Sequence, residues 1–425
     1  MSRFAPSFRI VLLAGAATVS IGSASSAFAQ AATSAADAPA ADDKSHVANY
    51  IDLSGSLGLA TNPRLQQSGS GSSLTGLGRV SAYAVHSVVS ERDSLSLSGY
   101  VENQSYTNGL RSTQSFDLEG RIRHRANSRL SLYGSAGFSG DVGGQLYNRF
   151  LSVPTGPSVI EVGNPLPPVG VIDPNFIAIN ARTYRLSGQA GLDYGVSARD
   201  SLNASIGYDH VFTSRSELDL NYDTVTGSVG WQRQFSERTF GGLRMVVAHS
   251  DYGDRGHADV FNPQVTANTQ LTEGWSASGS IGVSLVNERT TTVHNHSASL
   301  SFDASLCRTT PNETICGRAA RATQTSIGQG LVNATSVSVS YFRRLNAKDT
   351  IQAGASVARS SGGSGLLIAA PATFYSVNAS YNRKISPRLS TGVEAGLRKF
   401  DQRGADVPVG GSATVFLRYR LGDLL

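Results

Sequence analysis

Residues 201–208 read Ser-Leu-Asn-Ala-Ser-Ile-Gly-Tyr, and residues 389–397 read Leu-Ser-Thr-Gly-Val-Glu-Ala-Gly-Leu. In both stretches apolar residues alternate with small, polar or charged ones. Successive side chains of a β-strand point to opposite faces, so each stretch predicts a strand with one apolar and one polar face. Segments of roughly 10–15 residues with this alternation follow one another from residue 47 to residue 421, and they are longer than ordinary strands.

The connections between these segments are alternately short and long. The short polar turns are predicted at residues 90–93, 126–129, 198–200, 236–238, 272–274, 309–313, 346–349 and 386–388. The longer connections are predicted at residues 61–73, 108–112, 142–181, 214–221, 253–256, 290–294, 323–331, 360–371 and 404–410. Eight short and nine long connections predict 18 strands, with 16 or 20 left open.

This alternation is typical of a transmembrane β-barrel, which has an even number of strands, short periplasmic turns and longer external loops. The composition agrees, since Gly is 45 of 425 residues and charged residues are only 16%. A lipid-facing wall excludes charge, and turns use glycine. We therefore predict an all-β fold, a single antiparallel transmembrane β-barrel over residues 47–425.

The first 29 residues have the pattern of a cleaved signal peptide. Arg3 and Arg9 precede an apolar run over residues 10–21, and Ala27-Phe28-Ala29 fits the cleavage rule. Residues 30–46 are rich in Ala, Asp and Pro and predict a disordered periplasmic lead. Removing the two arginines lowers the formal charge from +5 to +3, which predicts no nucleic-acid partner.

The only two cysteines, Cys307 and Cys316, flank a predicted turn. A close pair in an exported chain suggests a local disulfide, and unpaired wall or lumen thiols are the alternative. Such a short loop would stabilise the hairpin by about 3 kcal/mol at most.

The chain resembles Gram-negative outer-membrane β-barrels of porin type. The resemblance rests on the strand pattern and on the last strand, residues 413–421, which is similar to the strand that the barrel-assembly machinery reads; residues 422–425 lack the usual terminal aromatic. Residues 299–304 and 337–341 also resemble barrels that accompany exopolysaccharide gene clusters. The resemblance implies an outer-membrane location and contact with outer-membrane lipid and lipopolysaccharide.

The polar faces of several predicted strands carry charge, which lipid would penalise, so these faces should line the lumen. Asp117, Glu119, Arg121, Arg123 and Arg125 share one face by their spacing of two. The other predicted lumen charges are Glu102, Arg185, Asp193, Asp209, Glu394, Arg398, Arg418 and Arg420. Two interpretations stay open: the charges line a water-filled pore, or they pair across the lumen and fill it.

Apolar residues of alternate positions should face lipid, and aromatic residues near the strand ends should form the interfacial girdles. The predicted wall residues include Leu97, Leu132, Val229, Val357 and Leu417. The predicted girdle residues are Tyr133, Tyr184, Tyr194, Tyr208, Trp231, Trp275, Tyr341, Tyr381 and Tyr419.

The longest connection, residues 142–181, holds six of the 14 prolines together with many apolar residues. Long loops are commonly functional, and the resemblance to porins implies that this third external loop folds into the lumen and narrows it. A surface flap, or a loop that contacts a neighbouring barrel, is the alternative.

Catalysis has little support in the sequence, and we predict that the protein is not an enzyme and has no cofactor. His294 and His296 share one face beside Ser297, but two ligands make no metal site. The leading hypothesis is a channel that passes small hydrophilic solutes or exports a polysaccharide. The alternative is a non-conducting structural or surface-binding barrel, and association of several copies is left open.

Overall fold

The computed structural model describes residues 46–65, 74–107, 110, 112–142, 182–214, 221–291, 294–326, 330–362, 371–402 and 407–423. The predicted signal peptide lies outside them, as do the predicted lead except His46 and the long connection except the backbone of Val142. The described residues form one 18-stranded sheet, which confirms the predicted fold class and strand number.

The first nine strands are β1 (His46–Thr61), β2 (Leu74–Val89), β3 (Asp93–Tyr106), β4 (Thr113–Arg125), β5 (Leu130–Val142), β6 (Arg182–Gly195), β7 (Asp200–Thr213), β8 (Tyr222–Ser236) and β9 (Thr239–Asp251). The next nine are β10 (Gly256–Gln270), β11 (Trp275–Thr290), β12 (His294–Thr310), β13 (Glu313–Ser326), β14 (Gly330–Arg344), β15 (Asp349–Ser361), β16 (Ala372–Lys384), β17 (Leu389–Gln402) and β18 (Gly410–Gly422). A short 3-10 helix, η2 (Gly253–Arg255), separates β9 from β10.

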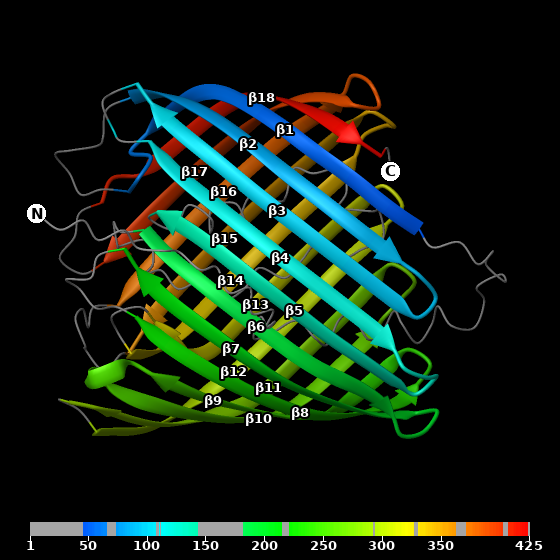
Figure 1. Ribbon diagram of the computed structural model, residues 1–425. Coiled ribbons are helices and arrows are strands. Elements are labelled where there is room, and N and C mark those ends of the chain that lie inside the picture. The colour runs from blue at the N-terminus through cyan, green and yellow to red at the C-terminus, as the bar shows by residue number, and fades with distance from the viewer. Residues whose placement is uncertain are drawn as a thin grey trace, which may run out of the picture.

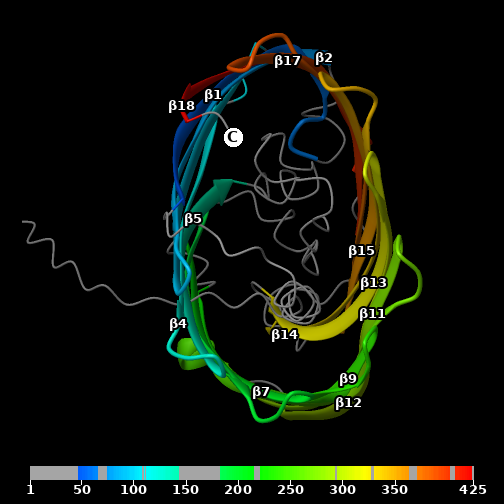
Figure 2. The ribbon, with the colours of Figure 1, turned by 90° about the vertical axis from the view of Figure 1, so that its right-hand side faces the viewer.

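The sheet closes on itself. Each strand is antiparallel to the next along the chain, and β1 pairs with both β2 and β18. The closing register runs from Tyr50 opposite Gly422 to Thr61 opposite Gly411. Closure leaves no sheet edge along this seam, as a membrane-spanning sheet requires. Figure 1 shows the tilted strands from the side, and Figure 2 shows the flattened ring that they form.

The two ends of the barrel differ. The eight short turns lie at the end where β1 begins and β18 finishes, on the right of Figure 1. Asn127 shapes one of them, because its Oδ1 accepts hydrogen bonds from the backbone N–H of Arg129 (2.8 Å) and Leu130 (2.9 Å). By the family rule this end is periplasmic and the opposite end, with the longer loops, is external.

One predicted connection is wrong in its bounds. The sequence predicts a loop over residues 323–331, but β13 continues to Ser326 and β14 begins at Gly330. Pairing of β13 with β14 reaches Ser326 opposite Gly330, whereas pairing of β12 with β13 ends at Phe302 and Arg321. The hairpin therefore extends beyond its attachment to β12, and local alternation could not show where that attachment ends.

The outer face is largely apolar between the two ends of the barrel. Leu118 and Ile122 are 53% and 54% exposed on one face of β4, and wall residues predicted from the sequence, such as Leu97, Val229 and Leu417, are exposed too. Stacked or tilted rings of Phe116, Phe138, Tyr184 and Phe212 join the outer faces of β4–β7. Tyr133 is a correction to the predicted girdle, because it lies opposite Arg123 on the inner face.

Within the described ranges, no helix has both the length and the apolar character needed to cross a membrane.

Candidate functional site: the inner wall of the barrel

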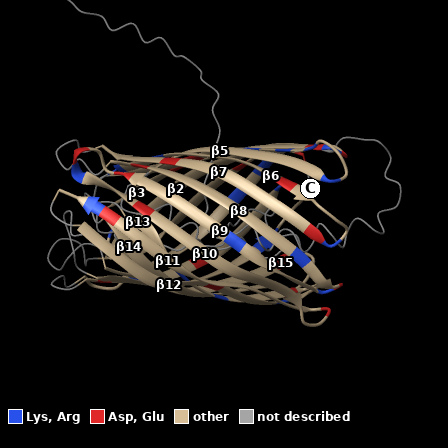
Figure 3. Ribbon diagram, turned by 90° about the horizontal axis from the view of Figure 1, so that it is seen from below, with Lys and Arg blue, Asp and Glu red and all other residues tan. Residues whose placement is uncertain are grey.

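The inner wall is built by the alternate residues that do not face lipid. On β4 the exposed apolar residues occupy even positions, so Asp117, Glu119, Arg121, Arg123 and Arg125 lie on the inner face. The same parity places the other sequence-predicted charges inward: Glu102 on β3, Arg185 and Asp193 on β6, Asp209 on β7, Glu394 and Arg398 on β17, and Arg418 and Arg420 on β18. Figure 3 shows that charge is sparse along the strands, most of whose length is uncharged.

One part of the inner wall, which we call the closing sector, comprises the inner faces of β17, β18, β1, β2 and β3. Arg420 makes a bidentate pair with Asp52 at 2.8 Å for both contacts, and Asp52 is its direct cross-strand partner over the seam. The two side chains are only 6% and 4% exposed. The Arg420 guanidinium also lies 4.1 Å from the centre of the Tyr50 ring. A buried, bidentate and stacked arginine is held rigidly and fills space.

The closing sector continues around Arg79. The guanidinium of Arg79, on β2, lies 3.6 Å from both Glu102 and Glu394. Glu102 is on the adjacent strand β3, and Glu394 is on β17, which lies on the other side of Arg79. Tyr100 donates a hydrogen bond to Glu102, and Gln104 Nε2 donates another at 2.6 Å. The charges of this sector are therefore neutralised largely by each other.

The segment after β1 folds over the same sector. Arg398 donates a hydrogen bond of 3.1 Å to the carbonyl of Pro63. Leu65 packs with inner-face residues of the strands nearby, among them Phe374 and Phe400. At the external end, this side of the lumen is covered by the chain itself.

The inner faces of β4–β7 form a second region, the arginine sector. Arg121 pairs with Glu119 two residues away on the same strand (2.7 Å), yet its side chain is 68% exposed. Arg123 lies 3.3 Å from Asp193 and is 49% exposed, and Arg185 lies 2.6 Å from Asp209 and is 45% exposed. Each of these inward-facing guanidinium groups therefore keeps much of its surface accessible although it has a carboxylate partner.

The inner wall that continues from β7 to β12 carries many hydroxyl and amide groups. Side chains of neighbouring strands are joined by short hydrogen bonds, such as Ser205 to Ser228 (2.7 Å) and Ser278 to Ser305 (2.6 Å). Ser301 donates to Asn262 at 2.8 Å. These side chains therefore satisfy one another across neighbouring strands and add no charge to the inner wall.

The end of the β13–β14 hairpin enters the lumen and rests on this wall, as Figure 2 shows for β14. Thr325 Oγ1 lies 2.7 Å from Oγ of Ser250 on β9, four strands away around the barrel. The backbone N–H of Leu331 donates to Glu288 on β11 at 3.2 Å. A contact across so many strands is possible only through the interior, so this hairpin narrows the external half of the lumen.

Apolar packing holds the hairpin in place. Leu331 belongs to a buried cluster with Val211, Tyr222 and Val286 from β7, β8 and β11. Tyr252, in the connection after β9, joins the cluster, and burial followed by the charge of Glu288 raises the pKa of its phenol. The phenol therefore stays neutral, as an apolar environment requires.

Some members of these networks were not singled out from the sequence. Asp52 and Arg79 are central to the closing sector, and Arg318 pairs with Asp303 on the opposite wall. A signal existed for Asp52, since it stands between the apolar residues Ile51 and Leu53 and must face inward by alternation. The partner of Asp52 could not be predicted from the neighbouring sequence.

The structure also places the two cysteines, the histidine pair and the serine that the sequence analysis named. Cys307 and Cys316 are cross-strand partners on β12 and β13, and they form a disulfide with their Cα atoms 4.1 Å apart. His294 and His296 lie on the outer face of β12, whereas Ser297 lies on its inner face. The strands and turns that the structure describes bring no three His, Cys, Asp or Glu side chains together as a metal site.

A closed 18-strand antiparallel barrel with an apolar outer surface is the architecture of Gram-negative outer-membrane proteins of porin type. No protein-family model matches this sequence, and no curated protein matches it. The fold is similar to that of Pseudomonas aeruginosa OpdL, at 10% identity and a TM-score of 0.41 over 88% of this chain and 98% of that one. It is also similar to that of OccK2 (OpdF) of the same organism, at 10% identity and a TM-score of 0.43, over 89% of this chain and 98% of that one. OprD, again from Pseudomonas aeruginosa, has 9% identity and a TM-score of 0.40, over 92% of this chain and 98% of that one.

Proposed function

We propose that this protein is an outer-membrane channel for small hydrophilic solutes. The observation that carries the proposal is the arginine sector: a closed 18-strand barrel keeps inward-facing guanidinium groups that are about half exposed or more. An 18-strand barrel is wide enough for an aqueous channel. Charged groups of both signs on its wall attract ions and polar solutes.

Small solutes fit this lumen better than a polysaccharide does. A sliding track for sugars would need aromatic rings presented to the open lumen. Tyr100 and Phe416 face inward, but they are only 9% and 5% exposed and pack within the closing sector. The β13–β14 hairpin narrows the passage further. Export of a polysaccharide therefore finds no support in the described inner wall.

A non-conducting barrel is the second candidate. The hairpin end, the segment that bears Leu65 and the buried charge pairs of the closing sector all reduce the free lumen. Whether residues 143–181 narrow it as well remains a prediction about a segment outside the described residues.

Single-channel recording in a planar bilayer tests the proposal. We expect discrete conductance steps from the refolded protein and larger steps after deletion of residues 143–181. The triple variant R121Q/R123Q/R185Q should lower the anion-over-cation permeability ratio about twofold, because cationic groups on a pore wall favour anions.

The matched control is R233Q/R308Q/R383Q. Arg233, Arg308 and Arg383 are 50%, 49% and 58% exposed, but they lie on the outer face. These substitutions should leave the permeability ratio unchanged. Silence of both the intact protein and the deletion would overturn the channel and favour the non-conducting barrel.

A further inference from the structure

The outer face of β7–β12 carries three successive rows of cross-strand partners toward the external end. The first row is apolar and contains Ile206, Gly227, Val247, Phe261, Leu285 and Ala298. The second contains Tyr208, Val225, His249, Asp259, Asn287 and His296. The third contains His210, Asp223, Asp251, His257, Arg289 and His294. We call the second and third rows the histidine patch.

The histidine patch concentrates one residue type on one side of the barrel. It holds five of the eight histidines of the chain, while Asp223, Asp251 and Asp259 lie among them. Random placement around the outer rim would not collect them on six adjacent strands.

The depth of the patch follows from its neighbours. Charge on the lipid face of a barrel costs about 2–4 kcal/mol at the bilayer midplane and close to nothing at the interface. The row directly below is apolar, with Phe261 and Leu285 40% and 47% exposed. The apolar row therefore suits the acyl chains of the external leaflet, and the charged rows above it suit the headgroup region.

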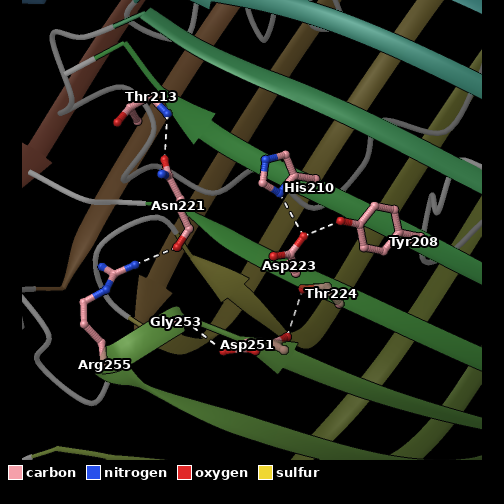
Figure 4. Close-up of polar contacts among 10 residues, drawn as sticks. Tyr208, His210, Thr213, Asn221, Asp223, Thr224, Asp251, Gly253 and Arg255 are labelled. Carbon is pink, nitrogen blue, oxygen red and sulfur yellow. Dashed lines mark hydrogen bonds and ion pairs between the residues drawn. The ribbon is translucent and has the colours of Figure 1, made fainter. Parts of the chain in front are cut away.

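The patch is organised through its aspartates. Nδ1 of His210 lies 2.8 Å from Oδ1 of Asp223, which also accepts a hydrogen bond from Tyr208, as Figure 4 shows. Nδ1 of His249 lies 2.7 Å from Oδ1 of Asp259. The rings of His249 and His257 are 5.9 Å apart.

This arrangement suits a bound oxyanion. A carboxylate on Nδ1 orients the imidazole and leaves Nε2–H as the free donor. The side chains of His210 and His249 are 34% and 54% exposed, so such a donor is accessible from the lipid side.

The charge of the patch changes sign with protonation. With neutral imidazoles, Arg289 and the three aspartates give a formal charge of −2, and protonation of all five histidines brings it to +3. Among the residues that the structure describes, Asp254 and Arg255 of η2 are the charged groups that adjoin the patch, and Arg255 Nη2 donates a hydrogen bond to the carbonyl of Asn221. Histidine is the side chain that ordinarily makes this change between about pH 5 and 8.

We propose that the histidine patch binds the phosphate groups of an external-leaflet lipid, whose acyl chains lie along the apolar row. The three rows provide contacts for both parts of such a lipid. Hydrogen-bond donors for the phosphate oxygens lie directly above an apolar strip that can contact the acyl chains. The site is on the outer face and does not depend on whether the lumen conducts.

Native mass spectrometry of the refolded full-length mature protein in detergent, with bisphosphorylated lipid A added, tests the proposal. We expect retention of lipid A about tenfold greater at pH 5.5 than at pH 8, because charged imidazoles bind phosphate more strongly than neutral ones. Lipid A stripped of both phosphates should be retained no better at pH 5.5 than at pH 8. Equal retention of the two lipids, or no dependence on pH, would overturn the proposal.

The variant H210Q/H249Q/H257Q/H294Q/H296Q, which removes all five histidines of the patch, should abolish the pH-dependent retention. The matched control is H86Q/H124Q, which alters two outer-face histidines at the periplasmic end, where His124 pairs with Asp93 at 2.6 Å. Heat-modifiable migration in gels verifies that each variant forms the barrel. R289Q is a milder variant and should weaken the retention of lipid A severalfold. Equal loss in the control would mean general adhesion to lipid.

Inorganic phosphate, added as a competitor, separates a lipid site from a site for the free ion. Millimolar phosphate should leave bound lipid A in place, because the acyl chains contribute to binding through the apolar row. Complete displacement by phosphate would contradict the lipid assignment.

Discussion

The closing sector and the arginine sector are made of the same residue types on the same face of the sheet, yet they differ in exposure. Arg420 is 6% exposed against Asp52, whereas Arg121 is 68% exposed although Glu119 lies within 2.7 Å. In the first sector the partner comes from the neighbouring strand and the pair is covered. In the second, the arginine of each pair stays about half exposed or more, both where one strand supplies the two charges, as for Arg121 and Glu119, and where two strands supply them.

The difference teaches that an inward-facing charge has no fixed role. A buried ion pair holds the barrel seam and leaves little charge for a solute, while an exposed pair keeps its field in the lumen.

Asp52→Asn should destabilise the barrel by about 3–5 kcal/mol, because it leaves the charge of Arg420 buried without a counter-charge. Unfolding in urea, followed by tryptophan fluorescence in lipid vesicles, measures the change. The double variant D52N/R420M should recover part of the loss, since it removes both charges. A loss of unfolding free energy below about 1 kcal/mol in D52N would mean that this pair contributes no more than an exposed ion pair does.

The disulfide provides a covalent reference outside both sectors. C307S/C316S should lower the free energy of unfolding by at most about 3 kcal/mol, because the closed loop is short. The intact protein under reducing conditions should approach the variant in the same measurement. A loss larger than that of D52N would reverse the expected order.

Leu331→Ala tests the wall that carries the hairpin. The substitution should cost about 2 kcal/mol, because it leaves space in a buried apolar cluster. The loosened hairpin should add fluctuations to the single-channel current. Leu331→Met, which conserves volume, should keep the current quiet; equal noise in both variants would mean that packing of this side chain does not hold the hairpin.

Arg123 and Asp193 should show the smallest effect. A double-mutant cycle with R123Q and D193N should give a coupling energy of roughly 0.2–1 kcal/mol, as for exposed ion pairs. The matching cycle for Asp52 and Arg420 should exceed it severalfold. Equal coupling energies would remove the distinction between the two sectors.

Local patterns determined much of this fold. The period of two, read strand by strand, assigned faces correctly for most wall residues, and polar turn sequences located the periplasmic turns. These signals are local because strand alternation and Asx-type turns depend on neighbouring residues. Tyr133 was assigned to the wrong face because a lone aromatic residue fits a girdle as well as a lumen.

The sequence by itself therefore determined the architecture, the number of strands and the inward direction of the charges. Only the tertiary structure decided which charges meet. Asp52 and Arg420 stand 368 residues apart and become neighbours through barrel closure. The inward course of the β13–β14 hairpin and the rows of histidines on β7–β12 likewise depend on register between strands, which the order of residues within any one strand does not specify.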